Sequence, residues 1–292
     1  LTLVPNGQLR LSTVGTEQRP ATPEELGTMK DMLRQGMEEG AFGYSTGLEY
    51  ATEVGATEEE VTELCRTAAA NGIYTPHTRN RDEASVEAVA EAIRSAGNAG
   101  IPLQVSHITP RGGREDLERC IELVDQARAK GQDVTFDMHT RTFGTTYLKV
   151  LLPSWALEGG KEDIARRLAD QETRERMKEY RSLITALGDW SRIVLLDNPA
   201  FPEFSRRNFA DIAAEMGKTP LDAAYDILLA EIDQLHRPFV ILHSYTEELL
   251  RMTYEHPLCM VGSDATALAP DGPLAGSSFH GSYTWASWFY RR

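Results

Sequence analysis

The sequence predicts an α/β fold, a (β/α)8 TIM-type barrel. Three observations support this prediction. Helical patterns alternate with short apolar runs almost from end to end, which favours parallel strands covered by helices. Imidazole or carboxylate side chains follow five of these runs. The length of 292 residues suits one large core, because α/β barrels commonly reach about 250 residues as a single unit.

The helices are recognised from their first residues and their apolar spacing. Thr22 and Glu25 have the spacing of a capping box, and Pro23 occupies the first helical position. Thr57 and Glu60 repeat the box before a second helix. Apolar residues at helical spacing predict four further helices, over 86–93, 117–127, 209–216 and 221–229.

Seven short apolar runs between these helices have the length of strands. They are 41–45, 73–76, 103–105, 134–136, 193–196, 239–242 and 259–261. We place all of them in one parallel barrel within a single domain, 1–292. The stretch at about 156–190 differs because it is dense in charge, and we expect it to be a solvated helical insertion.

The residues that follow the strands are the main functional signal. In α/β barrels the carboxyl ends of the strands build the active site, so side chains at these positions converge in space. Imidazoles with a carboxylate are ligands that zinc takes, with an open position left for water. A lone histidine there is more often structural, and an aspartate can cap a turn, but five such endings in one register favour a metal or catalytic site. The residues are His77, His107, Asp137 with His139, His243 and Asp264.

Other catalytic patterns are weaker. Gly43–Gly47 matches a nucleophile-elbow motif around Ser45, but a loop rather than the required helix is expected after Gly47. His236 and His256 lie away from strand ends and are interpreted as surface-loop residues. The three cysteines, Cys65, Cys120 and Cys259, lie in apolar neighbourhoods and are interpreted as buried thiols of a reducing compartment.

Composition excludes some partners. The chain has 30 basic and 44 acidic side chains and a formal net charge of −14, which argues against nucleic acid and against an anionic membrane surface. With no apolar run of membrane-spanning length and no signal-peptide pattern, we expect a cytoplasmic protein. Because the first residue is Leu1, we also expect the chain to be a segment of something longer.

The ordered motifs resemble one known family. Residues 40–50 (GAFGYSTGLEY), 74–79 (YTPHTR), 104–107 (QVSH) and 262–264 (GSD) are similar to segments of the D-aminoacylase, or N-acyl-D-amino-acid deacylase, family of the amidohydrolase superfamily. The similarity continues, in order, from residues 7–10 and 19–22 through 152–155 to 279–281, which is essentially the whole chain.

The resemblance implies a fold, a cofactor and a reaction. The fold would be the barrel of the metal-dependent amidohydrolases, with one or two Zn²⁺ ions and a water molecule as nucleophile. His77 and His107 match metal-binding histidines of the family, and Asp264 matches its last-strand aspartate, a metal ligand and proton shuttle. The expected substrate is a small-molecule N-acyl-D-amino acid or a related linear amide.

Six further residues are assigned to substrate binding. Tyr50 matches a family tyrosine near the substrate, Arg79 belongs to a His-x-Arg pattern, and His280 matches a loop histidine. The others are at or just beyond strand ends and are His139, Arg141 and His243.

Three departures from the family pattern concern the metal and the substrate. The family's first-strand His-x-His pair and metal-bridging cysteine correspond to positions before Leu1, so the resemblance implies a barrel that lacks its N-terminal strand or strands in this chain. A family lysine is replaced by Thr109, and a Tyr-Pro-Tyr pattern is replaced by residues 139–141 (HTR). In the family, the lysine and the Tyr-Pro-Tyr pattern face the substrate carboxylate. Arg141 or Arg111 is therefore a candidate for the missing cation.

Two other functions stay open at this stage. A cyclic-amide hydrolase of dihydroorotase or hydantoinase type shares the metal and the aspartate, but it commonly uses a carboxylated lysine, and the nearest candidate, Lys149, lies in an expected loop or helix. A non-catalytic fragment or a pseudoenzyme that serves as a binding module is the alternative of another class. Association of the chain into a homo-oligomer also stays open.

Overall fold

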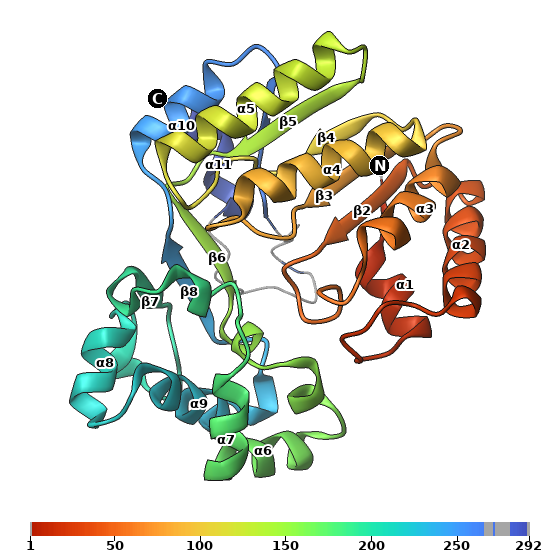
Figure 1. Ribbon diagram of the computed structural model, residues 1–292. Coiled ribbons are helices and arrows are strands. Elements are labelled where there is room, and N and C mark those ends of the chain that lie inside the picture. Colours follow the sequence, from red (N-terminus) through yellow and green to blue (C-terminus); the bar gives the residue numbers. More distant parts are fainter. Residues whose placement is uncertain (1, 266–270, 272–280, 291–292) are drawn as a thin grey trace. The chain divides into compact units, whose positions relative to one another are not determined.

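The computed structural model describes residues 2–265, 271 and 281–290, which form two compact units (Figure 1). The first unit comprises Leu1–Thr140 and Tyr245–Asp264, and the second comprises Arg141–Ser244 and Ala265–Arg292. In the described chain no helix is long and apolar enough to cross a membrane.

The first unit contains a six-stranded sheet in which every neighbouring pair of strands is parallel. The order across the sheet is β1 (Val4–Pro5), β2 (Gly43–Gly47), β3 (Ile73–His77), β4 (Leu103–Val105), β5 (Val134–His139) and β9 (Cys259–Gly262). This confirms the expected parallel α/β fold. The two-residue strand β1 at the edge is too short to be recognised from sequence.

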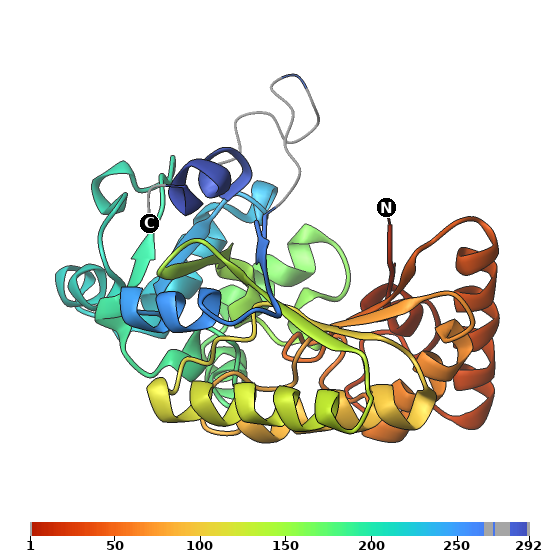
Figure 2. The same cartoon turned by 90° about the horizontal axis from the view of Figure 1, so that it is seen from above.

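Helices follow the strands in the alternating order that the sequence predicts. Those of the first unit are α1 (Asn6–Thr13), α2 (Pro23–Glu38), α3 (Glu58–Ala68), α4 (Ser85–Ala99), α5 (Arg114–Ala129) and α10 (Glu247–Tyr254). Helices α2 to α5 pack side by side in chain order. Figures 1 and 2 show α3 to α5 as a row along one side of the strands.

The two faces of this sheet differ in polarity, because successive side chains of a strand point to opposite faces. One face is apolar and lies in the main core of the unit, with Tyr44, Tyr74, Val105 and Phe136 among its buried residues. The alternate positions are polar and are occupied by Ser45, Thr75, Gln104 and Thr135, of which Ser45 pairs in register with Thr75 and Gln104 with Thr135. The helices therefore cover one face, and the other is left to polar side chains.

The two predicted capping boxes have different outcomes. At α2 the box is complete, since Thr22 accepts a hydrogen bond from the backbone of Glu25 and the Glu25 carboxylate accepts one from the backbone of Thr22. At α3 Thr57 caps the helix, but the Glu60 carboxylate binds the buried guanidinium of Arg10 at 2.5 Å instead. A buried cation needs a counter-charge more than the helix needs a second cap.

The second unit corrects the prediction that all seven apolar runs belong to one barrel. Runs 193–196 and 239–242 form β7 (Ile193–Leu195) and β8 (Phe239–His243), which pair antiparallel in a separate sheet of order β6-β8-β7 with β6 (Phe143–Tyr147). A short apolar run does not reveal its partner, because parallel and antiparallel strands bury similar residues.

Helices complete the second unit. They are α6 (Lys161–Ala169), α7 (Gln171–Lys178), α8 (Phe209–Met216), α9 (Pro220–Ala230) and α11 (Gly281–Phe289), with the 3-10 helices η1 (Leu148–Leu151), η2 (Ser154–Leu157), η3 (Thr185–Leu187), η4 (Trp190–Arg192), η5 (Pro202–Phe204) and η6 (Ile232–Gln234).

The charged stretch at about 156–190 is helical, but it is less solvated than expected. Ile164, Leu168 and Met177 of α6 and α7 are buried in the core of the second unit. The stretch therefore forms part of a larger unit that begins at Arg141. Its apolar residues were overlooked among the charges, because Ala156, Leu183 and Ile184 are also buried in this core.

Gly43 provides a test of the close pairing between β2 and β3. A Cβ atom at Gly43 would lie 2.1 Å from the backbone oxygen of Ile73, so Gly43→Ala should lower the free energy of unfolding by about 2 kcal/mol or more. In α2, a Cβ at Gly27 would meet nothing within 4 Å, so Gly27→Ala should raise stability by up to about 1 kcal/mol. Urea unfolding measures both, and equal effects of the two substitutions would contradict the pairing.

Candidate active site

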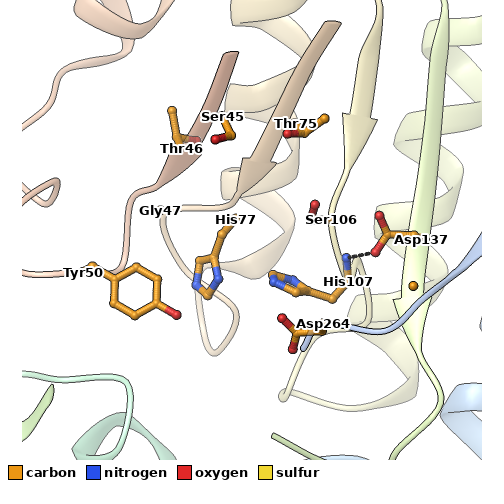
Figure 3. Close-up of a pocket in the computed structure, with 11 residues that line it drawn as sticks. Ser45, Thr46, Gly47, Tyr50, Thr75, His77, Ser106, His107, Asp137 and Asp264 are labelled. Carbon is orange, nitrogen blue, oxygen red and sulfur yellow. Dashed lines mark hydrogen bonds between the residues drawn. The ribbon is translucent and has the colours of Figure 1, made fainter. Parts of the chain in front are cut away.

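A pocket of about 350 Å³ opens at the carboxyl ends of the parallel strands of the first unit (Figure 3). Its lining comes from the ends of β2, β3, β5 and β9 and from the segment after β4. The lining residues are Ser45, Thr46, Gly47, Tyr50, Thr75, His77, Ser106, His107, Asp137, Gly262 and Asp264. The structure thus brings together four of the five predicted strand endings.

His77 and His107 face each other in this pocket. Their ring centroids are 4.8 Å apart and their planes are nearly perpendicular, at 85°. His77 is the last residue of β3, and its Nε2 lies 2.8 Å from Oε2 of Glu49. The ring of Tyr50 lies on its other side, at 5.1 Å between centroids. Figure 3 shows the His77 ring between Tyr50 and His107.

His107 is held through its backbone. Its φ of +38° is in the left-handed region, which side chains other than glycine rarely adopt. Its backbone N–H donates to Oδ1 of Asp137 at 2.8 Å, and its carbonyl accepts from Arg81 at 2.7 Å. A side-chain hydrogen bond from Gln104 at 3.0 Å holds the second oxygen of Asp137. Together these bonds stabilise an unfavourable backbone conformation that aims the ring at the pocket.

The His107 imidazole is neutral at physiological pH. Burial lowers its pKa well below the usual value, and the nearby charge of Arg81 lowers it further. Its Nδ1 is buried and has no hydrogen-bond partner among the described residues. A neutral, unpartnered imidazole nitrogen is available to a ligand or a metal ion.

Asp264 reaches the pocket from the segment after β9. Its φ of +42° is also in the left-handed region, and its side chain is 45% exposed. Its Oδ2 lies 4.0 Å from Nε2 of His139. In Figure 3 its carboxylate lies beside the ring of His107. The carboxylate is therefore close to the imidazoles of His107 and His139 and accessible to water.

Two imidazoles and a carboxylate around one pocket are the donor types that zinc takes. The unpartnered Nδ1 of His107 also fits a metal ligand. In the part of the chain that the structure describes, no three His, Cys, Asp or Glu side chains are close enough together to hold an ion. The site fits zinc in its chemistry, while the described residues assemble only part of a coordination sphere.

A buried charge network, not predicted as part of the site, lies behind His77. The Glu49 carboxylate binds His77 through Oε2 and the Arg111 guanidinium through Oε1, and Arg111 also binds Asp82. Burial would raise the pKa of Glu49, but the hydrogen bond to His77 and the charge of Arg111 outweigh it and lower the pKa to about 2. The only sequence signal is that Glu49 adjoins Tyr50 in the family-like motif. The network also corrects the suggestion that Arg111 supplies a substrate-binding cation, because two carboxylates already occupy it.

Some predicted substrate-binding residues lie elsewhere. Arg79 forms a two-bond ion pair with Glu91 of α4, at 2.8 and 2.7 Å, and does not line the pocket. His139 is buried at the end of β5, 5.3 Å from the Tyr245 ring. His243 ends β8 in the second unit, where its exposed ring contacts Phe143 at 6.0 Å.

The remaining assignments have other outcomes. Arg141 begins the second unit, and His280 lies outside the described residues. Ser45 lines the pocket, and the segment after Gly47 is a turn, as expected when Ser45 is not a nucleophile. His236 is exposed as predicted, whereas His256 packs on Phe136 with ring centroids 5.2 Å apart.

A parallel sheet with histidines and aspartates at its carboxyl ends defines an α/β fold with a metal-hydrolase type of site. No protein-family model matches the chain. The chain is 31% identical, over 77% of its length, to D-aminoacylase of Alcaligenes xylosoxydans xylosoxydans. It is 28% identical, over 90% of its length, to N-acyl-D-glutamate deacylase of the same organism.

A solved structure agrees with these relatives. It is that of N-acyl-D-glutamate deacylase from Bordetella bronchiseptica complexed with zinc and a phosphonate inhibitor that mimics the tetrahedral intermediate. It matches 90% of this chain with 28% identity and a TM-score of 0.67. The resemblance to the D-aminoacylase family of the amidohydrolase superfamily is thus confirmed. The chain spans about half the length of these relatives, 40% and 46% of the two curated proteins.

Asp137 offers a test of how His107 is held. Asp137→Ala leaves the backbone N–H of His107 and the amide of Gln104 without their acceptor, so we expect a loss of about 2 kcal/mol of stability. Asp133 lies just before the same strand with an exposed side chain, so Asp133→Ala should change stability by less than about 0.5 kcal/mol. Urea unfolding gives the free energies, and the His107 amide signal in NMR should shift only in the first variant. Equal stability of the two variants would show that Asp137 does not support His107.

Proposed function

We propose that the chain carries part of the active site of a zinc-dependent hydrolase that cleaves the amide bond of a small linear N-acyl compound. The observation that carries the proposal is the convergence of His77, His107 and Asp264 on one pocket, with the imidazole rings 4.8 Å apart. The preferred substrate class is the N-acyl-D-amino acids, because the curated relatives are named for hydrolysis of such compounds.

In this proposal His77 and His107 hold the metal through neutral nitrogens, and Asp264 contributes its carboxylate. Zinc, when bound, supplies a positive charge that lowers the pKa of a water molecule and polarises the scissile carbonyl. Asp264 takes a proton from the attacking water and returns it to the leaving nitrogen, so that a carboxylate and a free amine are released. Tyr50 lines the pocket beside His77, where its phenol can donate a hydrogen bond to the substrate.

Recognition of the substrate carboxylate is assigned to a cation. Arg79 and Arg111 form ion pairs with carboxylates of the protein. Arg141 is kept as the substrate-binding cation on the sequence comparison alone, because it stands where the family has its Tyr-Pro-Tyr pattern. His139, His243 and His280 stay predicted substrate-binding residues. A cytoplasmic location, a homo-oligomer and the absence of nucleic-acid or membrane partners also stay predictions.

The cyclic-amide alternative receives no support from the described residues. It would use a lysine among the metal ligands, whereas Lys149 lies in the 3-10 helix η1 of the second unit, 5.2 Å from the Tyr147 ring. The other alternative, a non-catalytic fragment or a pseudoenzyme that serves as a binding module, is tested by the hydrolysis experiment that follows.

The test of function is hydrolysis of a panel of N-acetyl-D-amino acids by the zinc-loaded protein. We expect release of free amino acid, and Asp264→Asn should lower kcat by about 10²–10⁴-fold, because proton transfer loses its carrier. Asp125→Asn, at an exposed carboxylate on α5, should leave kcat unchanged. If the full gene product binds no zinc and hydrolyses no amide, the protein is a binding module and not an enzyme.

Arg141→Ala tests recognition of the substrate. If Arg141 binds a carboxylate, the substitution should raise KM for N-acetyl-D-amino acids by about 10-fold or more, whereas the corresponding uncharged amides should be affected little. Steady-state kinetics on the paired substrates measures the difference. Unchanged kinetics on both would remove Arg141 from the site.

A further inference from the structure

Glu49 divides its two carboxylate oxygens between different partners. It lies in the turn that follows β2, with Oε2 at 2.8 Å from Nε2 of His77 and Oε1 at 2.5 Å from a terminal nitrogen of Arg111. The side chains of Glu49 and Arg111 are each only 5% exposed. Water therefore competes little with these two contacts, and each oxygen of Glu49 keeps a defined partner.

The hydrogen on His77 follows from the chemistry of this arrangement. A guanidinium group donates hydrogen bonds and accepts none, so Oε1 of Glu49 accepts from Arg111. A carboxylate buried against a guanidinium is ionised, and an ionised carboxylate only accepts. In the neutral ring, which is the form that can bind a metal, Nε2 of His77 must then carry the hydrogen, and Nδ1 is left as the nitrogen with the lone pair.

Arg111 is itself immobilised. Its Nε lies 2.9 Å from Oδ1 of Asp82, and a terminal nitrogen lies 3.1 Å from Oδ2. Its backbone N–H also donates to the carbonyl of Arg81 at 2.6 Å. The guanidinium therefore cannot turn away from Glu49 without leaving buried carboxylates unpaired, which is strongly unfavourable.

The two pocket histidines are consequently oriented by different means. His107 is placed by hydrogen bonds to its backbone, and its own Nδ1 has no partner among the described residues. His77 is the one whose ring nitrogen is engaged by a charged side chain. Carboxylates that hold the outer nitrogen of a metal-binding histidine fix its tautomer and raise its basicity.

We propose that Glu49, held by Arg111, is a positioning residue that keeps His77 in the Nε2–H tautomer and reserves its Nδ1 for the metal. The identity of the ligand at Nδ1 rests on the proposed function, whereas the tautomer does not. The Asp82, Arg111, Glu49 and His77 side chains thus form one chain of contacts that ends at the pocket.

Glu49→Gln is the informative variant because Arg111 dictates how the amide must turn. The amide oxygen has to face the guanidinium, so the amide NH₂ faces Nε2 of His77. The ring then has to accept a hydrogen bond at Nε2, which moves its hydrogen to Nδ1 and removes the metal-binding lone pair.

The ¹⁵N signals of the His77 imidazole in the zinc-free protein report the tautomer directly. We expect Nε2–H in the wild type and Nδ1–H in Glu49→Gln. Zinc affinity, measured by competition with a chromophoric chelator, should fall about 10–100-fold in the same variant. Glu60→Gln is the matched control, since Glu60 is an equally buried carboxylate paired with Arg10 away from the pocket. It should change stability without changing the His77 signals or zinc affinity.

Three outcomes would overturn the proposal. Nδ1–H on His77 in the wild type excludes it without any variant, so a Glu49→Gln protein that fails to fold does not protect it. Unchanged tautomer and zinc affinity in Glu49→Gln, or an equal loss of zinc affinity in Glu60→Gln, also excludes it. If tautomer and zinc affinity respond as expected but no N-acyl-D-amino acid is hydrolysed, the positioning role stands and only the proposed activity fails.

Discussion

The parallel register of the sheet is the constraint on which the rest of the first unit depends. Gly43 pairs with Ile73 and Gly47 with His77, so that β2 and β3 end at the same level. The register requires glycine at position 43, where the backbones approach too closely for a side chain. Because parallel strands share one carboxyl edge, residues as far apart in the chain as Ser45 and Asp264 meet at one pocket.

Two groups of buried ion pairs lie in the first unit, and one of them adjoins the pocket. Arg10 with Glu60 supports the outer part of the unit, while Glu49 with Arg111 and Asp82 supports the site. Buried ion pairs contribute little net stability when they form, but removing one partner is costly. Such networks therefore favour one arrangement of side chains over others. Beside the pocket, a fixed Glu49 carboxylate in turn fixes which nitrogen of His77 carries the hydrogen.

Strain accompanies this organisation. His107 and Asp264 both adopt left-handed backbone conformations, and both project into the pocket. For His107 the compensation is visible, since Asp137 binds its N–H and Arg81 its carbonyl. Gly262 contributes to the same arrangement, because a Cβ atom there would lie 3.1 Å from the Asp137 carboxylate. Backbone strain at residues that face a pocket is typical of functional sites.

The sequence by itself determined the local elements and the polar strand ends. The helix starts at Thr22 and Thr57 and the meeting of His77 and His107 follow from capping chemistry and from strand geometry. Only the tertiary structure decided that β7 and β8 leave the parallel sheet, that Arg79 turns to Glu91, and that Glu49 holds His77. The physical reason is that spacing along the chain encodes which face a residue occupies. The partner of a strand or of a charge is selected by long-range packing, which no local pattern records.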